Sequence, residues 1–94
     1  MMNTITNEKL AKYFSVTGKA LEMVKDKFDA NRIKEAADFF DMASRYYSDA
    51  KHFSEKGDKV TAFAALNYAH GWLDAGARIG LFRVKDSRLF TVDD

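Results

Sequence analysis

The sequence contains no cysteine and no proline among its 94 residues. The lack of cysteine excludes a disulfide framework, a thiolate metal site, an iron–sulfur cluster and a cysteine nucleophile. The lack of proline removes the residue that most often interrupts long helices, and thirteen alanines also favour helix. Together these features favour a soluble, intracellular, helical protein.

An excess of charge of either sign is also lacking, because 15 basic residues stand against 14 acidic ones. No block of like charge marks a nucleic-acid-binding arm or an acidic tail. No apolar run approaches the roughly 18 residues that span a bilayer, and residues 1–12 lack the pattern of a secretion signal. We therefore expect a cytoplasmic protein with one domain over residues 1–94 and no membrane partner.

Three segments carry apolar residues at the 3-4 spacing of amphipathic helices. Thr6 is a suitable N-cap for the first helix, Gly57 a C-cap for the second and Asp58 an N-cap for the third. Short connections then favour an all-α, antiparallel, up-down-up three-helix bundle. The spacing predicts the helices at about residues 6–28, 32–56 and 59–80.

Two further features bear on the packing of this bundle. Phe39, Tyr46 and Phe53 form a second apolar stripe on the second helix, as expected of a helix that contacts two neighbours. After the third helix, residues 81–94 contain two short β-prone runs around a turn. We expect this tail to be extended or to form a hairpin.

The densest polar feature in an apolar setting lies on one face of the third helix. Its members follow at spacings of three, four and four residues, with Tyr68 and Trp72 on the flanks: Asn67, His70, Asp74 and Arg78. Asp74 lies one turn beyond His70 and could accept its ring N–H. The face is either a pocket for a small ligand or a partner's helix end, or a hydrogen-bonded network that ties the helix to a neighbour or to the tail.

His52 lies three residues from both Asp49 and Glu55. Carboxylate and imidazole one turn apart occur in di-iron bundles, but those sites draw ligands from four helices. This chain has two histidines in total. A solvated helix face is the simpler interpretation, and we expect no metal and no other cofactor.

Arg45 and His52 are separated by six residues on the second helix. This pair resembles the Arg-x(4–6)-His signature of the HEPN family, whose members include many metal-independent ribonucleases. The resemblance implies that the two side chains handle the 2′-hydroxyl and the phosphate of RNA. Basic residues further along the chain would then contact phosphates: Arg78, Arg83, Lys85 and Arg88.

The segment YAHGWLDAGAR at residues 68–78, together with residues 37–50 and Gly57-Asp58, resembles an archaeal family of small helical proteins of unknown function. The resemblance covers most of residues 8–92. It implies a three-helix bundle in an archaeal cytoplasm, and it implies no activity. The hairpin around Gly57 is also similar to a single tetratricopeptide unit, but no second repeat follows the pattern.

No nucleophile elbow or phosphate-binding loop is present, so no catalytic residue is predicted. The wide apolar surface of the second helix and the apolar tail favour a non-enzymatic module that binds another protein or a second copy of itself, as in a homodimer. Two alternatives stay open. One is RNA binding or cleavage through Arg45 and His52, and the other is small-ligand binding at the face of His70 and Asp74.

Overall fold

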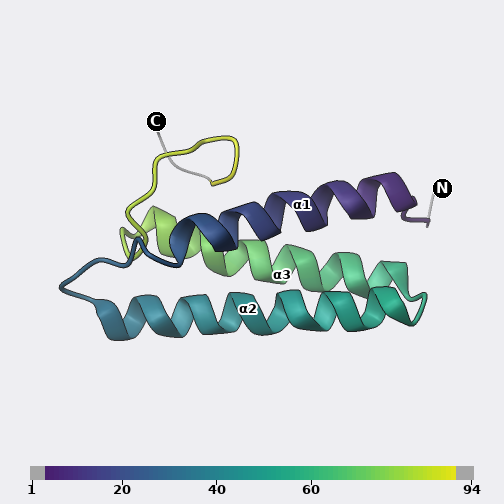
Figure 1. The fold of residues 1–94 in the computed structure, drawn as a ribbon, viewed down its shortest axis with the longest axis horizontal. Helices are drawn as coiled ribbons and strands as arrows, with labels where there is room; N and C mark the ends of the chain where they lie inside the picture. The colour runs from purple at the N-terminus through teal and green to yellow at the C-terminus, as the bar shows by residue number, and fades with distance from the viewer. Residues whose placement is uncertain (1–3, 91–94) are drawn as a thin grey trace.

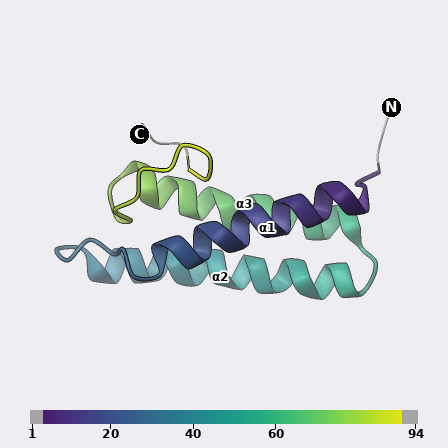
Figure 2. The ribbon, with the colours of Figure 1, turned by 45° about the horizontal axis from the view of Figure 1, so that its top comes forward.

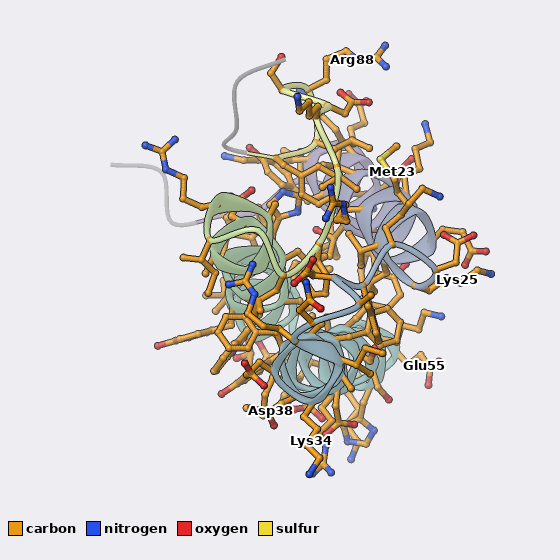
Figure 3. The ribbon with its side chains drawn as sticks, turned by 90° about the vertical axis from the view of Figure 1, so that its left-hand side faces the viewer. Met23, Lys25, Lys34, Asp38, Glu55 and Arg88 are labelled. Atoms are coloured by element: carbon orange, nitrogen blue, oxygen red, sulfur yellow. The ribbon has the colours of Figure 1, made fainter. Side chains whose placement is uncertain are left out.

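The computed structural model describes residues 4–90, which form three helices and a C-terminal segment. The helices are α1 (Asn7–Val24), α2 (Ile33–Glu55) and α3 (Lys59–Arg78). They run up, down and up, and α2 packs along the whole of α3 while α1 lies across the pair (Figure 1). Viewed end-on, the helices occupy the corners of a triangle, with the C-terminal segment on the side of α1 and α3 (Figure 3). The predicted all-α, antiparallel three-helix fold is confirmed.

The helix ends follow capping signals in the sequence. The Thr6 hydroxyl accepts a hydrogen bond from the backbone N–H of Lys9 at 3.1 Å. The Asp58 carboxylate accepts one from the backbone N–H of Thr61, also at 3.1 Å. Gly57 adopts a φ of 82°, which side chains with a Cβ rarely allow. The two N-caps and the glycine turn between α2 and α3 therefore lie where the sequence predicted them.

The predicted end of the first helix at residue 28 is wrong. The helix ends at Val24, and Phe28 instead forms an antiparallel β-bridge with Phe82. Two backbone hydrogen bonds of 2.8 Å flank the bridge, from Asp29 N–H to the Leu81 carbonyl and from Arg83 N–H to the Lys27 carbonyl. The Phe28 ring still packs at 5.7 Å from the Phe82 ring. A loop residue therefore packs against the core where the helical spacing predicted a further turn of the first helix.

Within residues 81–90 the C-terminal segment forms no hairpin: it is irregular up to Asp86 and then makes a turn over residues 87–89. Over residues 81–90 the bridge at Phe82 is the sole strand-like pairing, and Thr91 and Val92 of the second β-prone run lie outside the described residues. The segment folds back over α1 and α3 (Figures 1 and 2). Leu81, Phe82 and Phe90 are each at most 3% exposed. An isolated C-terminal segment would be marginally stable. Burial of these three apolar side chains in the core holds the segment against the helices.

The largest buried side chain of the segment, Phe82, lies directly on α3. Its ring covers Gly76, where an added Cβ would overlap the ring atoms. The ring belongs to a core cluster that also contains Val24 and Leu73. A second cluster around Leu10 and Leu66 fills the other end of the bundle. Gly76 therefore permits a close approach of the C-terminal segment to the core cluster at this end of the bundle.

Candidate functional site

His70 joins α3 to both α1 and the C-terminal segment. Its Nε2 lies 2.6 Å from the Leu89 carbonyl oxygen, and its Nδ1 lies 3.2 Å from Thr17 Oγ1. Because a carbonyl only accepts, we assign the ring proton to Nε2, and Nδ1 then accepts the Thr17 hydroxyl proton. The Phe90 ring stacks on the imidazole with 6.4 Å between centroids. His70 thus fastens residues 89–90 to two helices.

Asp74 does not accept the ring proton of His70. Its Oδ1 lies 3.8 Å from Nε2, which is beyond hydrogen-bond distance, and the Leu89 carbonyl takes that proton instead. Neither His70 nor Asp74 lines the groove along α3 that Asn67 and Trp72 line. The contacts of His70 are those of a hydrogen-bonded network that connects α3 to α1 and to the C-terminal segment.

Replacing His70 by leucine is expected to lower the free energy of unfolding by about 1–3 kcal/mol, because the buried Thr17 hydroxyl and the Leu89 carbonyl lose their partner. The amide hydrogens of Leu89 and Phe90 should exchange faster with solvent. Urea unfolding and hydrogen exchange measure the two effects. His52→Leu is the matched control, since His52 is exposed on α2. Equal effects of the two substitutions would contradict the role assigned to His70.

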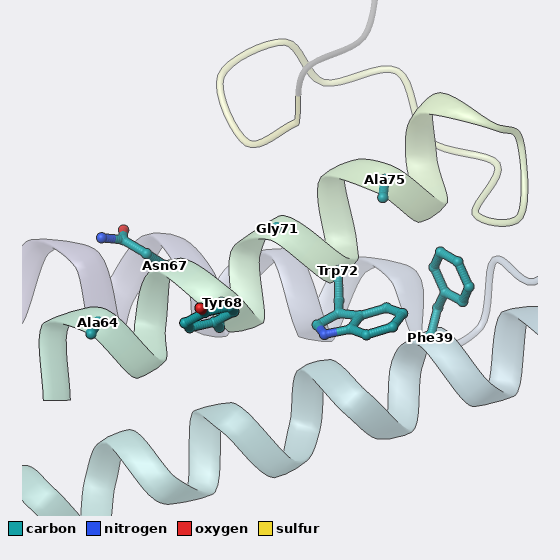
Figure 4. A pocket seen from close by; sticks show the side chains of 7 residues that line it. All are labelled: Phe39, Ala64, Asn67, Tyr68, Gly71, Trp72 and Ala75. Atoms are coloured by element: carbon teal, nitrogen blue, oxygen red, sulfur yellow. The ribbon is translucent and has the colours of Figure 1, made fainter. Parts of the chain in front are cut away.

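Asn67 and Trp72, predicted beside His70, face a different surface. They line an open groove of about 690 Å³ between α2 and α3, shown in Figure 4, together with Phe39, Ala64, Tyr68, Gly71 and Ala75. The Trp72 ring meets the Phe39 ring edge-on at 4.9 Å. Tyr68 stacks on Tyr46 at 5.3 Å between ring centroids, yet 64% of it is exposed. The residues predicted to share one face of the third helix are therefore divided. Asn67 and Trp72 line the groove, whereas His70 contacts the C-terminal segment. Arg78 is exposed at the end of α3.

The exposed face of α3 carries no charge before Arg78. Its exposed residues are Val60, Ala64, Asn67, Tyr68, Gly71 and Ala75, while Lys59 and Asp74 are half-buried. The exposed face of α2 is instead charged along its length, at Lys34, Glu35, Asp38, Asp41, Arg45, Asp49, Lys51 and Glu55. An exposed mid-helix glycine weakens a helix by about 1 kcal/mol relative to alanine. Apart from Gly71's own chain neighbours and the adjacent backbone of α3, no atom of residues 4–90 lies within 4 Å of the position that a Cβ would take at Gly71. Contacts among the described residues therefore do not require glycine there.

This face was missed in the sequence, although a signal for it was present. The informative signal was the stretch from Val60 to Leu73, which contains no Asp, Glu, Lys or Arg. This stretch includes exposed as well as buried positions of α3, so the lack of charge extends to its solvent-facing side.

Arg45 and His52 lie on the solvent side of α2. The Arg45 guanidinium donates to the Asp41 carboxylate at 2.9 Å, and 74% of the arginine side chain is exposed. His52 is exposed and contacts the edge of the Phe53 ring. Acidic residues surround the pair on the same helix, so an approaching phosphate would meet Asp41 and Asp49 as well as the arginine.

Two of the other arginines assigned to RNA are also engaged with carboxylates. Arg83 lies 3.2 Å from Asp29, and Arg88 lies 3.0 Å from Asp86. Hydrogen bonds from Arg32 and, to a lesser degree, Arg83 hold the pKa of Asp29 below its ordinary value, against the opposite effect of burial. Asp29, Arg32 and Arg83 thus connect the loop after α1 to the segment after α3. Lys85, the remaining basic residue of that set, is exposed.

Residues 4–90 contain no group of three or more histidine, aspartate and glutamate side chains placed to hold a metal ion. His52, Asp49 and Glu55 are each exposed on α2. Within the same range, no helix combines the length and the apolar character needed to cross a membrane.

The comparison with protein families found one that spans the three helices. The family described as "Protein of unknown function (DUF357)" matches residues 12–82, from α1 through the bridge at Phe82. The matched range includes the groove and His70 but ends before Leu89 and Phe90. The comparisons with curated proteins and with solved structures found no match. Because the match covers well over half of the sequence, the chain belongs to the DUF357 family of proteins of unknown function.

Proposed function

We propose that the protein is a non-enzymatic interaction module that binds a helix of another protein in the groove between α2 and α3. The observation that carries the proposal is the uncharged, exposed face of α3, with Tyr68 and Trp72 at the groove. A contiguous apolar surface on a folded protein marks an interaction site. Tyrosine and tryptophan are also among the residue types that contribute most to binding energy at interfaces.

The shape of the groove favours a helix as the bound element. The groove runs along α3, which supplies most of its lining, beside the antiparallel α2, which supplies Phe39. A partner's helix can pack against such a surface with 8–10 Å between helix axes when the side chains at the contact are small. Ala64, Gly71 and Ala75 supply small side chains along the α3 wall. Phe39 and Trp72 form the apolar floor on which a partner's side chains would rest.

The groove suits binding better than catalysis. Its polar groups are the Asn67 amide, the Tyr68 hydroxyl and the Trp72 indole N–H. These groups donate and accept hydrogen bonds, but they do not pair a nucleophile with a base. RNA binding through Arg45 is less favoured, because Asp41 holds that guanidinium.

Site-specific photocrosslinking in the native host tests the proposal. A benzophenone amino acid at Asn67 places the probe in the groove, and the same amino acid at His52 places it on the charged face of α2. We expect an adduct with one defined protein from the Asn67 position and none from the His52 position.

The adduct alone does not establish the interaction. The identified partner, purified, should bind the full chain, and Tyr68→Glu should weaken the binding by about 30-fold or more, as expected for an interface hot spot. Equal adducts from both positions, no adduct from Asn67, or full binding by Tyr68→Glu would overturn the proposal.

A further inference from the structure

The α2 side of the groove has an acidic rim. Glu35 lies four residues before Phe39, which lines the groove, and Asp49 lies three residues after Tyr46, whose ring stacks on Tyr68 of the groove. The helical spacing therefore places both carboxylates beside the groove on α2. Asp38 lies further out on the solvent side of α2 (Figure 3). All three carboxylates are exposed, and none makes an ion pair with another described residue. We name this set, Glu35, Asp38 and Asp49, the acidic rim.

The α3 side of the groove has no matching charge. Ala64, Asn67, Gly71 and Ala75 form that side. The groove is thus apolar at its floor and uncharged along its α3 side. Its α2 side carries the three carboxylates of the acidic rim, and Arg45 on the same side of α2 is paired with Asp41. An interface is specific when the potentials of the two partners are complementary, and charges at a rim control the rate and the salt dependence of association.

Building on the proposed function, we propose that the groove takes an amphipathic helix that carries Lys or Arg along one margin of its apolar stripe. The apolar stripe would cover Phe39, Tyr68 and Trp72, and the basic margin would face the acidic rim. The net charge of the chain is +1, so the attraction is local to this rim and does not come from the protein as a whole.

A second copy of the chain fits the groove less well. On α2 and α3, that copy could offer the exposed face of α3, whose one charge is Arg78, or the exposed side of α2, where five carboxylates stand against three basic side chains. Neither surface presents a row of basic side chains to the rim. Lysines do lie on α1, but the apolar stripe of that helix is already packed in its own core, with Leu10, Ala20 and Val24 buried. Charge complementarity therefore favours a different protein as the partner.

Trp72 is the sole tryptophan of the chain and lies in the groove, so its fluorescence reports occupancy directly. The probes are two 18-residue helical peptides with one leucine stripe, whose polar positions are all lysine in the first and all glutamate in the second. We expect the lysine peptide to shift Trp72 emission to shorter wavelengths and to bind at least tenfold more tightly than the glutamate peptide. Salt should weaken its binding, because it screens exposed charges.

Variants that each remove one negative charge of α2 show where the lysine peptide binds. Asp38→Asn and Asp49→Asn should each weaken binding of the lysine peptide by about two- to fivefold, the effect of an exposed ion pair. Glu55→Gln removes the same charge from the other flank of α2, where Figure 3 shows Glu55, and should leave the affinity unchanged.

Three outcomes would overturn the inference. The first is equal binding of the two peptides, and the second is an equal loss of affinity in Glu55→Gln and Asp38→Asn. The third is a dimer in sedimentation of the protein alone, with a Trp72 emission shift that disappears on dilution, because the groove would then hold a second copy. If photocrosslinking at Asn67 still captures one defined partner, the proposed function survives the failure of this inference; without that adduct, both fail.

Discussion

Replacing Phe82 by alanine is expected to lower the free energy of unfolding by about 3–5 kcal/mol, the usual cost of removing a buried phenylalanine. Phe82 is 1% exposed and packs against Phe28 and Gly76. A chain of this length has a total stability of about 5–14 kcal/mol. The loss would therefore reduce the melting temperature by on the order of 20 °C, which thermal and urea unfolding can measure.

Tyr68→Ala is the matched control for this prediction. It removes an aromatic ring of similar size, but the ring is 64% exposed and stacks on one neighbour, Tyr46. We expect a loss of at most about 1 kcal/mol, the value of one aromatic pair. A similar loss in Phe82→Ala and Tyr68→Ala would show that the C-terminal segment does not contribute to the core as described.

Substitutions of two glycines of α3 by alanine are expected to act in opposite directions. Gly76→Ala should destabilise the protein by about 1–3 kcal/mol, because its Cβ would overlap the buried Phe82 ring. Gly71→Ala should stabilise it by up to about 1 kcal/mol, because the position is open and alanine favours helix. Urea unfolding of the two variants measures the difference.

The cause of the Gly76 effect can be tested by combining it with Phe82→Ala. With the ring removed, the added methyl group has room, and Gly76→Ala should become neutral or stabilising in that background. Such a coupling of the two substitutions is the signature of direct contact. Additive effects would mean that the cost of Gly76→Ala arises elsewhere.

Helix number, order and caps follow from local signals, and these were predictable from the sequence. The 3-4 spacing, the side chain of Thr6 and the Gly57-Asp58 turn act within a few residues of each other. The end of α1 was not predictable, because Phe28 satisfies the helical spacing and also pairs with Phe82, far away along the chain. A long-range backbone pairing leaves no local pattern that distinguishes it from one more helical turn.

The candidate site was predicted in part. The sequence identified Asn67, His70 and Trp72 as the notable side chains of the third helix, but it placed them in one feature. The structure divides them, because His70 turns toward Thr17 and Leu89 while Trp72 turns toward Phe39. Spacing fixes the angle between side chains on a helix, and it does not reveal which neighbour occupies each direction.

The two sides of α3 differ in what a substitution would affect. Gly76 and Leu73 are packed against the core, where most substitutions would threaten folding, whereas Tyr68 and Gly71 face outward. Under the proposed function, changes at the outward positions would alter what the protein binds while leaving the buried side intact. The choice of partner could then diverge among related chains on an unchanged scaffold.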